Sequence, residues 1–285
     1  MLTTICALCF RIFSNPIANM LQKTLVERHS AILINLYSYG LLSLACVINV
    51  CMVDYNFTSY GLSFWNYVIL AGFLCTLGTV CLIKALQYGE LSVLGPINSY
   101  KCLVGLLFGF VILGEIPSVK AILGVLLIIC GSWFIFDTVK GGFKLSLFKR
   151  KDIILRFCAL FLTGAEAAVL KKIILISSPE ECFILWCFSG FAFSLILVLL
   201  LKKKFQPLFK KDIFAIFIIA VCLGLMQFST NIVFEKLDVG LSLALFQLSS
   251  IVAIIFGYKV FKESNVIKKL IGAVIMIVGS CLILL

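Results

Sequence analysis

Charged residues are scarce in this sequence, and histidine is nearly absent. Only 13% of the 285 residues are charged, whereas soluble domains carry about 25%. Because His29 is the single histidine, a zinc or haem site would lack its usual ligands, and no metal or cofactor is expected. A membrane-embedded enzyme would need a nucleophile with its base, or paired acids. The apolar runs hold no such cluster, so no catalytic residue is predicted.

Long polar stretches are missing as well. Hydrophobic residues make up 62% of the chain, against about 45–50% in soluble proteins, so much of the surface must face lipid. The net charge of +11 would suggest nucleic acid in a soluble protein. Here the basic residues lie between hydrophobic runs, as in Lys149–Lys151 and Lys202–Lys204, which is what membrane topology requires. Membrane lipid is therefore an expected partner, and nucleic acid is not.

Ten apolar runs have the length that a bilayer requires. A hydrocarbon core of about 30 Å is crossed by about 20 helical residues. One or two such runs could be buried helices of a soluble protein, but ten leave no polar sequence to cover them. The sequence predicts an all-α integral membrane protein of about ten transmembrane helices. Their spans are residues 2–22, 31–53, 64–86, 92–113, 118–137, 153–176, 182–201, 213–234, 241–261 and 265–285.

The two halves of the chain repeat each other at an offset of about 150 residues. The run Gly89–Ser92 aligns with Val239–Ser242, and small residues recur at matching places. Small residues at a fixed spacing let helix backbones approach closely in a membrane. The other aligned pairs are Glu115 with Glu263, Gly124 with Gly272, Gly131-Ser132 with Gly279-Ser280, Gly105 and Gly109 with Ala253 and Gly257, Lys23 with Lys172, and Tyr39-Gly40 with Ser189-Gly190.

Each repeat holds five helices, so the second repeat must enter the membrane from the opposite side. We expect a first unit at residues 1–137, a basic connecting loop at 138–152 and a second unit at 153–285. Inverted repeats are typical of transporters that alternate access around a site near the midplane.

Several motifs resemble the EamA domain of the drug/metabolite transporter superfamily. The run Ala85–Pro96 is similar to the joint between its third and fourth helices, and Leu113–Pro117 to its Gly-Glu turn. Gly124–Gly131 and Gly272–Gly279 are similar to its closing helix. The resemblance covers nearly the whole chain as two units. It implies a ten-helix carrier of the cytoplasmic (inner) membrane that moves metabolites, often outward, with both termini in the cytoplasm.

The second half departs from this pattern in two places. Phe246 stands where the first half has Pro96, and Lys262 replaces the glycine of the Gly-Glu pair.

Polar residues within the apolar runs are the candidates for a substrate path, because ionisable groups in a membrane are costly unless they face a cavity or a partner. Arg11, Asn15, Asn19 and Lys23 are four residues apart and share one helix face, and Pro16 removes a backbone donor among them. The alternative is a stripe that only packs against other helices, with Lys23 extending to the interface.

Lys101 and Glu166 lie deep in their predicted helices, where reaching the interface is difficult. Both are assigned to the central cavity, with a structural salt bridge of Glu166 to Lys101 or Arg11 as the alternative to a role in proton coupling. Neutral polar side chains complete the predicted substrate-binding set: Asn98, Gln227, Asn231 and Gln247, with Thr230 and Ser250 as weaker candidates.

The balance of deep charges favours an anionic or zwitterionic metabolite as the substrate, since Arg11 and Lys101 face one acid, Glu166. A flippase for lipids or lipid-linked sugars is the nearest alternative. A channel, a purely structural subunit and a membrane-embedded enzyme are less favoured.

The orientation in the membrane is predicted from the basic residues of the loops. The loops near 138–152 and 202–212 each carry five basic residues on the side opposite the termini. The positive-inside rule therefore places both termini outside, against the resemblance.

Overall fold

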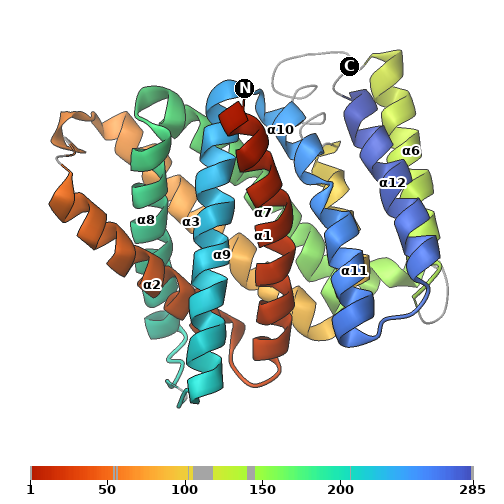
Figure 1. The fold of residues 1–285 in the computed structure, drawn as a ribbon, viewed down its shortest axis with the longest axis horizontal. Helices are drawn as coiled ribbons and strands as arrows, with labels where there is room; N and C mark the ends of the chain where they lie inside the picture. The colour runs from red at the N-terminus through yellow and green to blue at the C-terminus, as the bar shows by residue number, and fades with distance from the viewer. Residues whose placement is uncertain are drawn as a thin grey trace.

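The computed structural model describes residues 2–53, 55, 57–101, 103–104, 118–139, 145–205 and 207–283. Within these ranges the chain is helical and contains no strand (Figure 1). The α-helices are α1 (Leu2–Val26), α2 (Ala31–Met52), α3 (Leu62–Tyr88), α4 (Leu91–Leu94), α6 (Val119–Phe136), α7 (Lys151–Ile176), α8 (Pro179–Leu200), α9 (Lys210–Lys236), α10 (Val239–Phe246), α11 (Ser249–Phe261) and α12 (Val266–Ile283). Short 3₁₀ segments are η1 (Phe57–Ser59), η2 (Pro96–Tyr100) and η3 (Leu145–Lys149).

Most of the predicted membrane spans are present as helices. Nine helical segments of the described chain are long and apolar enough to cross a bilayer, with α10 and α11 counted as one. The remaining predicted span, 92–113, begins with α4 and η2 and then falls partly outside the described residues. The protein is therefore an all-α membrane protein, as its apolar runs predict.

Two of the spans are broken inside the membrane. The first break follows α4, where Gly95 and Pro96 end the α-helical hydrogen bonding and η2 continues. The second lies between α10 and α11, although Phe246 stands where a proline is found in the first half. There the amides of Gln247 and Leu248 bond to Ala244 (3.0 Å) and Leu245 (3.2 Å), three residues back. This tighter 3₁₀ pattern interrupts the helix without a proline.

The packing of the helices follows a two-fold pattern. Exchanging the halves turns α1 into α7 and α9 into α3, and the structure packs α1 along α9 and α3 along α7. The same exchange turns α2 into α8 and α6 into α12, and each of these pairs packs together (Figure 1). Two inverted five-helix repeats related by a two-fold axis produce this set of contacts.

Glycines mark the place where the axis passes between α6 and α12. A Cβ added to Gly131 would lie 2.6 Å from the carbonyl oxygen of Gly272, and one added to Gly272 would lie 2.6 Å from that of Gly131. Gly124 and Gly279 form the second reciprocal pair, with the same two distances. The glycines that repeat in the sequence therefore meet each other, because only glycine permits this backbone approach.

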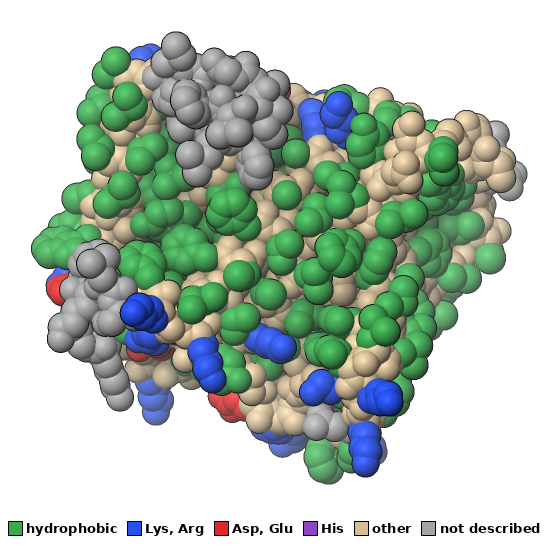
Figure 2. All heavy atoms as spheres, turned by 180° about the vertical axis from the view of Figure 1, so that it is seen from behind, with side chains coloured by type: hydrophobic (Ala, Val, Ile, Leu, Met, Phe, Trp, Pro, Cys, Tyr) green, Lys and Arg blue, Asp and Glu red, His purple; other side chains and the backbone are tan. Residues whose placement is uncertain are grey.

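The two ends of the molecule differ in charge. Both termini lie at one end, the terminal face (Figure 1). Lysine and arginine side chains gather along the opposite edge, while apolar side chains cover much of the face between (Figure 2). We call this edge the basic face. It holds the start of α7, the turn after α8 and the start of α9, with Lys149–Lys151, Lys202–Lys204 and Lys210-Lys211. A charged rim beside an apolar surface is what a membrane-spanning orientation requires.

We predict that the basic face is cytoplasmic. A Lys204→Cys variant without native cysteines should resist an impermeant maleimide in intact cells and react once the cells are permeabilised. Reaction in intact cells would instead support the orientation that the EamA resemblance implies.

The α6–α12 contact predicts opposite effects for two Gly→Ala substitutions. Gly131→Ala should lower the free energy of unfolding by about 1–3 kcal/mol, because the new methyl group overlaps a backbone carbonyl. Among the described residues, a Cβ at Gly164 in α7 meets only Val104, at 3.9 Å, so Gly164→Ala should stabilise by about 0.5–1 kcal/mol through helix propensity. Thermal unfolding in detergent measures both. Equal effects would contradict the proposed helix contact.

Candidate functional site

A cavity of about 120 Å³ lies between α1, η2, α7 and α9 and brings together most of the polar residues predicted from the sequence. Its lining includes Arg11, Asn15, Asn19, Asn98, Lys101, Glu166 and Gln227. Residues far apart in the sequence and from both repeats thus meet around one space.

Helix α1 contributes a polar stripe to this cavity. Arg11, Asn15 and Asn19 line it, as their spacing predicts, and Gln22 extends the stripe. Pro16 lies inside α1 without ending it. Lys23 belongs to the same face but is not among the residues that line the cavity. Its amino group instead bonds to the carbonyl of Gly89 and to Glu263, both at 2.9 Å.

Among the residues that the structure describes, the guanidinium group of Arg11 has neutral partners only. Its Nε donates to the hydroxyl of Thr230 at 2.9 Å, and its Cζ lies 4.8 Å from the centroid of the Phe246 ring. Its Nη1 is buried without a hydrogen-bond partner. A hydrogen-bond donor of the cavity wall is thus left open.

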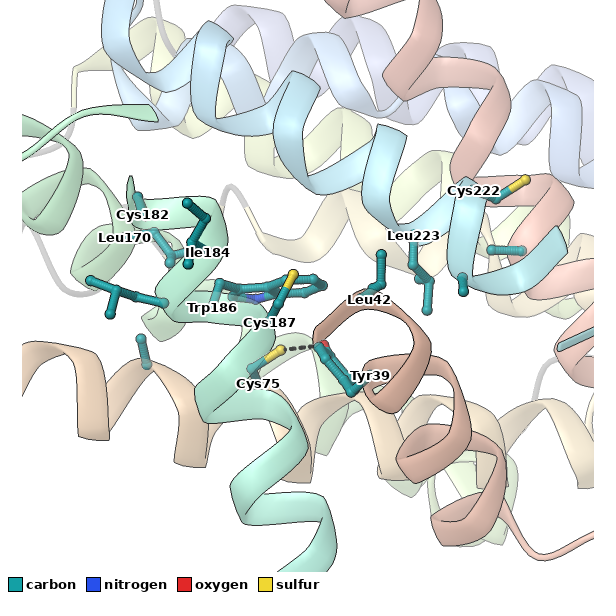
Figure 3. Packing of buried hydrophobic residues seen from close by; sticks show 14 of the residues in the cluster. Tyr39, Leu42, Cys75, Leu170, Cys182, Ile184, Trp186, Cys187, Cys222 and Leu223 are labelled. Carbon is teal, nitrogen blue, oxygen red and sulfur yellow. Dashed lines mark hydrogen bonds between the residues drawn. The ribbon is translucent and has the colours of Figure 1, made fainter. Parts of the chain in front are cut away.

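Glu166 sits among aromatic and sulfur-containing side chains. Trp186 donates its indole N–H to Glu166 Oε1 at 2.9 Å, and Lys101 attracts the carboxylate electrostatically. Beside them the Tyr39 hydroxyl and the Cys75 thiol share a hydrogen bond of 2.8 Å, and the rings of Tyr39 and Trp186 are 4.8 Å apart (Figure 3). Aromatic residues in apolar runs carry no polar signal, which is why Tyr39 and Trp186 were not predicted as part of the site.

Arg156 is a cavity residue that the sequence analysis missed. It is buried, and its Nε donates to the carbonyl of Leu94 at 2.7 Å while its Nη2 donates to Asn98 Oδ1 at 3.0 Å. The break before Pro96 deprives Leu94 of a helical partner, and Arg156 replaces it. Because Arg156 follows the basic run Lys149–Lys151 closely, its sequence position resembles that of a loop residue.

Two predicted residues lie outside the cavity lining. Asn231 accepts from Gln227 at 2.9 Å and donates to the carbonyl of Pro179 at 3.0 Å, so it joins α9 to the start of α8. Gln247 donates to Leu243 at 2.9 Å, and its Oε1 is buried without a partner. Asn231 thus bridges two helices, as the alternative reading describes, whereas Gln247 bonds within its own helix.

Positive charge prevails in the cavity lining. Arg11, Lys101 and Arg156 face a single acid among the lining residues, Glu166.

The sequence signature of the EamA-like transporter family matches residues 2–137 and again residues 150–285. The chain belongs to this family. An EamA-like transporter moves small molecules across a membrane, which agrees with a cavity lined by polar and charged residues from both repeats.

Comparison with solved structures supports the fold of this EamA-like transporter. One protein crystal structure superposes with a TM-score of 0.67 at 13% sequence identity, and the alignment covers 96% of both chains. At this identity the similarity concerns the fold alone. No curated protein matches the sequence closely enough to count as a relative.

The two cavity arginines should differ in their effect on stability. Arg156→Met leaves the Leu94 carbonyl without a partner and should lower the free energy of unfolding by about 1–3 kcal/mol. Arg11→Met removes a half-buried cation that pairs with no acid among the described residues, so the unfolding temperature should stay constant or rise. Thermal unfolding in detergent tests this, with Arg28→Met, whose side chain is 61% exposed, as the control. Equal losses for both arginines would contradict these roles.

Proposed function

We propose that this EamA-like transporter carries a small anionic or zwitterionic metabolite across the cytoplasmic membrane by alternating access to the central cavity. The observation that carries the proposal is the open, buried Nη1 of Arg11 in the cavity wall.

A charge without a counter-ion is expensive at the depth of Arg11. Insertion of an arginine at the centre of a membrane helix costs about 2.5–3.5 kcal/mol. Arg11 has only a hydroxyl and an aromatic ring as partners among the described residues. An anionic group of the substrate offers the missing charge and an acceptor for Nη1, and charge-assisted hydrogen bonds of this kind are the stronger ones.

The rest of the wall favours a substrate with an apolar body. Tyr39, Trp186, Phe234 and Phe246 line the same cavity as Arg11. Binding sites for small molecules combine such apolar walls with a few placed polar groups. The wall therefore suits an organic anion better than an inorganic one.

Glu166 is the group best placed to couple transport to a proton. It is buried, lines the cavity and bonds to Trp186, and Lys101 attracts it. An acid in this position can exchange a proton as substrate enters or leaves, which makes it the second functional candidate in the cavity.

Substrate binding can be tested without a transport assay. Of the three tryptophans, only Trp186 lines the cavity, so Trp65→Phe with Trp133→Phe leaves one fluorescent reporter. We expect 3-phenylpropanoate to quench it and the uncharged amide 3-phenylpropanamide to bind much more weakly. Arg11→Gln should weaken the carboxylate at least about tenfold, since a bond to a charged group contributes about 1.5–3 kcal/mol. Phenylalanine in the same titration tests the zwitterionic class.

The matched control is Arg28→Gln, which removes an arginine outside the cavity. Equal affinity for carboxylate and amide, or an unchanged affinity in Arg11→Gln, would overturn the anion assignment.

Transport itself is tested by uptake into proteoliposomes, with and without a proton gradient. Lys101→Ala and Arg11→Ala should abolish uptake or change its substrate preference while the protein still inserts in the membrane. Normal uptake by both variants would refute the site. Movement of a fluorescent lipid instead of soluble anions would favour the flippase.

A further inference from the structure

A cluster of ion pairs joins the two repeats at the basic face, and its members are largely buried except for Glu90, whose side chain is 42% exposed. It involves the end of α1, the joint between α3 and α4, and the turn between α11 and α12. Lys23 lies 2.9 Å from Glu263 Oε1 and also donates to the carbonyl of Gly89. The side chains of Lys23 and Glu263 are only 14% and 5% exposed. Such a pair is not a surface salt bridge, so its rupture leaves a poorly hydrated charge.

Glu263 also caps the first half of the broken helix. Its Oε1 accepts the backbone N–H of Leu91, and its Oε2 accepts the N–H of Ser92, each at 2.9 Å. The Ser92 hydroxyl bonds to Oε2 as well. Burial alone would raise the pKa of Glu263, but hydrogen bonds from Ser92 and the charge of Lys23 outweigh it and lower the pKa. Glu263 is therefore an ionised cap supplied by the other repeat.

A second lysine completes the cluster. The side chain of Lys269 in α12 is fully buried and lies 2.5 Å from Glu90 Oε2 and 2.7 Å from Ser92 Oγ. Two cations and two anions thus balance. We call these four residues and Ser92 the cross-repeat lock, because Lys23, Glu90 and Ser92 come from the first repeat and Glu263 and Lys269 from the second.

The cross-repeat lock lies directly beyond the cavity. Asn19 and Gln22 of α1 line the cavity, and Lys23 is the next residue. Asn98 lines it as well, six residues after Ser92 on the same broken span. The polar stripe of α1 thus leads from the cavity to the lock.

The opposite face holds only part of an equivalent arrangement. Lys171 of α7 bonds to the carbonyls of Phe234 and Leu237, the latter at 3.2 Å, at the joint between α9 and α10. Lys171 stands 148 residues after Lys23, and Leu237 stands 148 residues after Gly89. Among the described residues Lys171 forms no ion pair, whereas Lys23 does. Glu115, which aligns with Glu263, lies outside the described residues.

We propose that the cross-repeat lock is the gate that closes the cavity at the basic face, and that it opens and re-forms once in each transport cycle. This inference rests on the alternating access proposed above. A gate must have two discrete arrangements. Each contact among the lock residues joins the first repeat to the second. Breaking the lock therefore frees the α3–α4 joint from the α11–α12 turn and opens a route to Gln22.

The test measures accessibility rather than uptake, so it can fail while the transport proposal stands. A Gln22→Cys variant without native cysteines is placed in sealed vesicles. An impermeant maleimide is added on the side from which Lys204→Cys reacts, which identifies the basic face in either orientation. Glu263→Gln and Lys23→Gln should each raise the labelling rate of position 22 by about tenfold or more, since each destabilises the closed state.

Two controls separate a gate from a damaged fold. Asp137→Asn breaks the neighbouring Lys268–Asp137 pair on the same face, whose side chains are 43% and 36% exposed, and should leave the rate unchanged. Cys187, which is fully buried, should stay unreactive as the sole cysteine in each lock variant. An unchanged rate at position 22, or a matching rise at Cys187, would overturn the proposal.

Gly257→Ala breaks the lock without changing its charge. A Cβ at this position would collide with Glu263 Oε2 and lie 2.9 Å from Ser92 Cβ. The same rise in labelling of position 22 is expected, and no rise would contradict the gate.

Discussion

The absence of water in the bilayer core is the constraint on which this structure depends. Each buried charge and each carbonyl released from a helix needs a partner inside the protein. Breaking a span at Gly95-Pro96 frees the carbonyl of Leu94, and Arg156 of the other repeat binds it. Starting the same span at Leu91 leaves amides without acceptors, and Glu263 of the other repeat accepts them. The broken span is stable only because the second repeat completes it.

The same constraint explains how much of the fold could be predicted from the sequence. Because the lipid core requires long apolar runs, each membrane span can be recognised in the sequence on its own. The repeated glycines predicted close helix contacts, and Gly131 packs against Gly272 while Gly124 packs against Gly279. The break at Gln247 could not be predicted from the sequence, because it depends on local 3₁₀ hydrogen bonding and not on a proline. The alignment of Lys23 with Lys172 was one residue out, since Lys171 makes the equivalent bond.

The candidate site was predictable where a polar side chain interrupts an apolar run. Arg11, Lys101 and Glu166 stand out for this reason, and all three line the cavity. The hydrogen-bond and ion-pair partners of these residues were harder to predict from the sequence, because each partner comes from another helix. In the sequence Glu263 looks like an ordinary turn residue. In the structure it accepts hydrogen bonds from the amides of Leu91 and Ser92 and from Lys23, all in the other repeat. Conversely, Asn231 has the residue type and the position in its helix that predict a cavity residue, but its side chain donates to the carbonyl of Pro179.

The differences between the repeats locate the chemistry of this molecule. At an offset of 148 residues, Arg11 aligns with Ala159, and both positions line the cavity. The two-fold pattern thus places equivalent positions around one space, while the charge comes from one copy of this pair. Lys269, which has no charged counterpart because it aligns with Ala121, adds a second ion pair to the cross-repeat lock.

This asymmetry has an energetic consequence. Two inverted repeats with identical sequences would give the two end states of a transporter equal free energies, because exchanging the repeats converts one state into the other. Here the basic face holds an ionic lock with two lysines, and the described part of the opposite face holds Lys171 on backbone carbonyls. A buried charge that loses its partner is more costly than a carbonyl that loses one of its donors. With the cross-repeat lock as the proposed gate, we expect the empty carrier to rest closed at the basic face, and we expect a substrate anion at Arg11 to supply the interaction that shifts this balance.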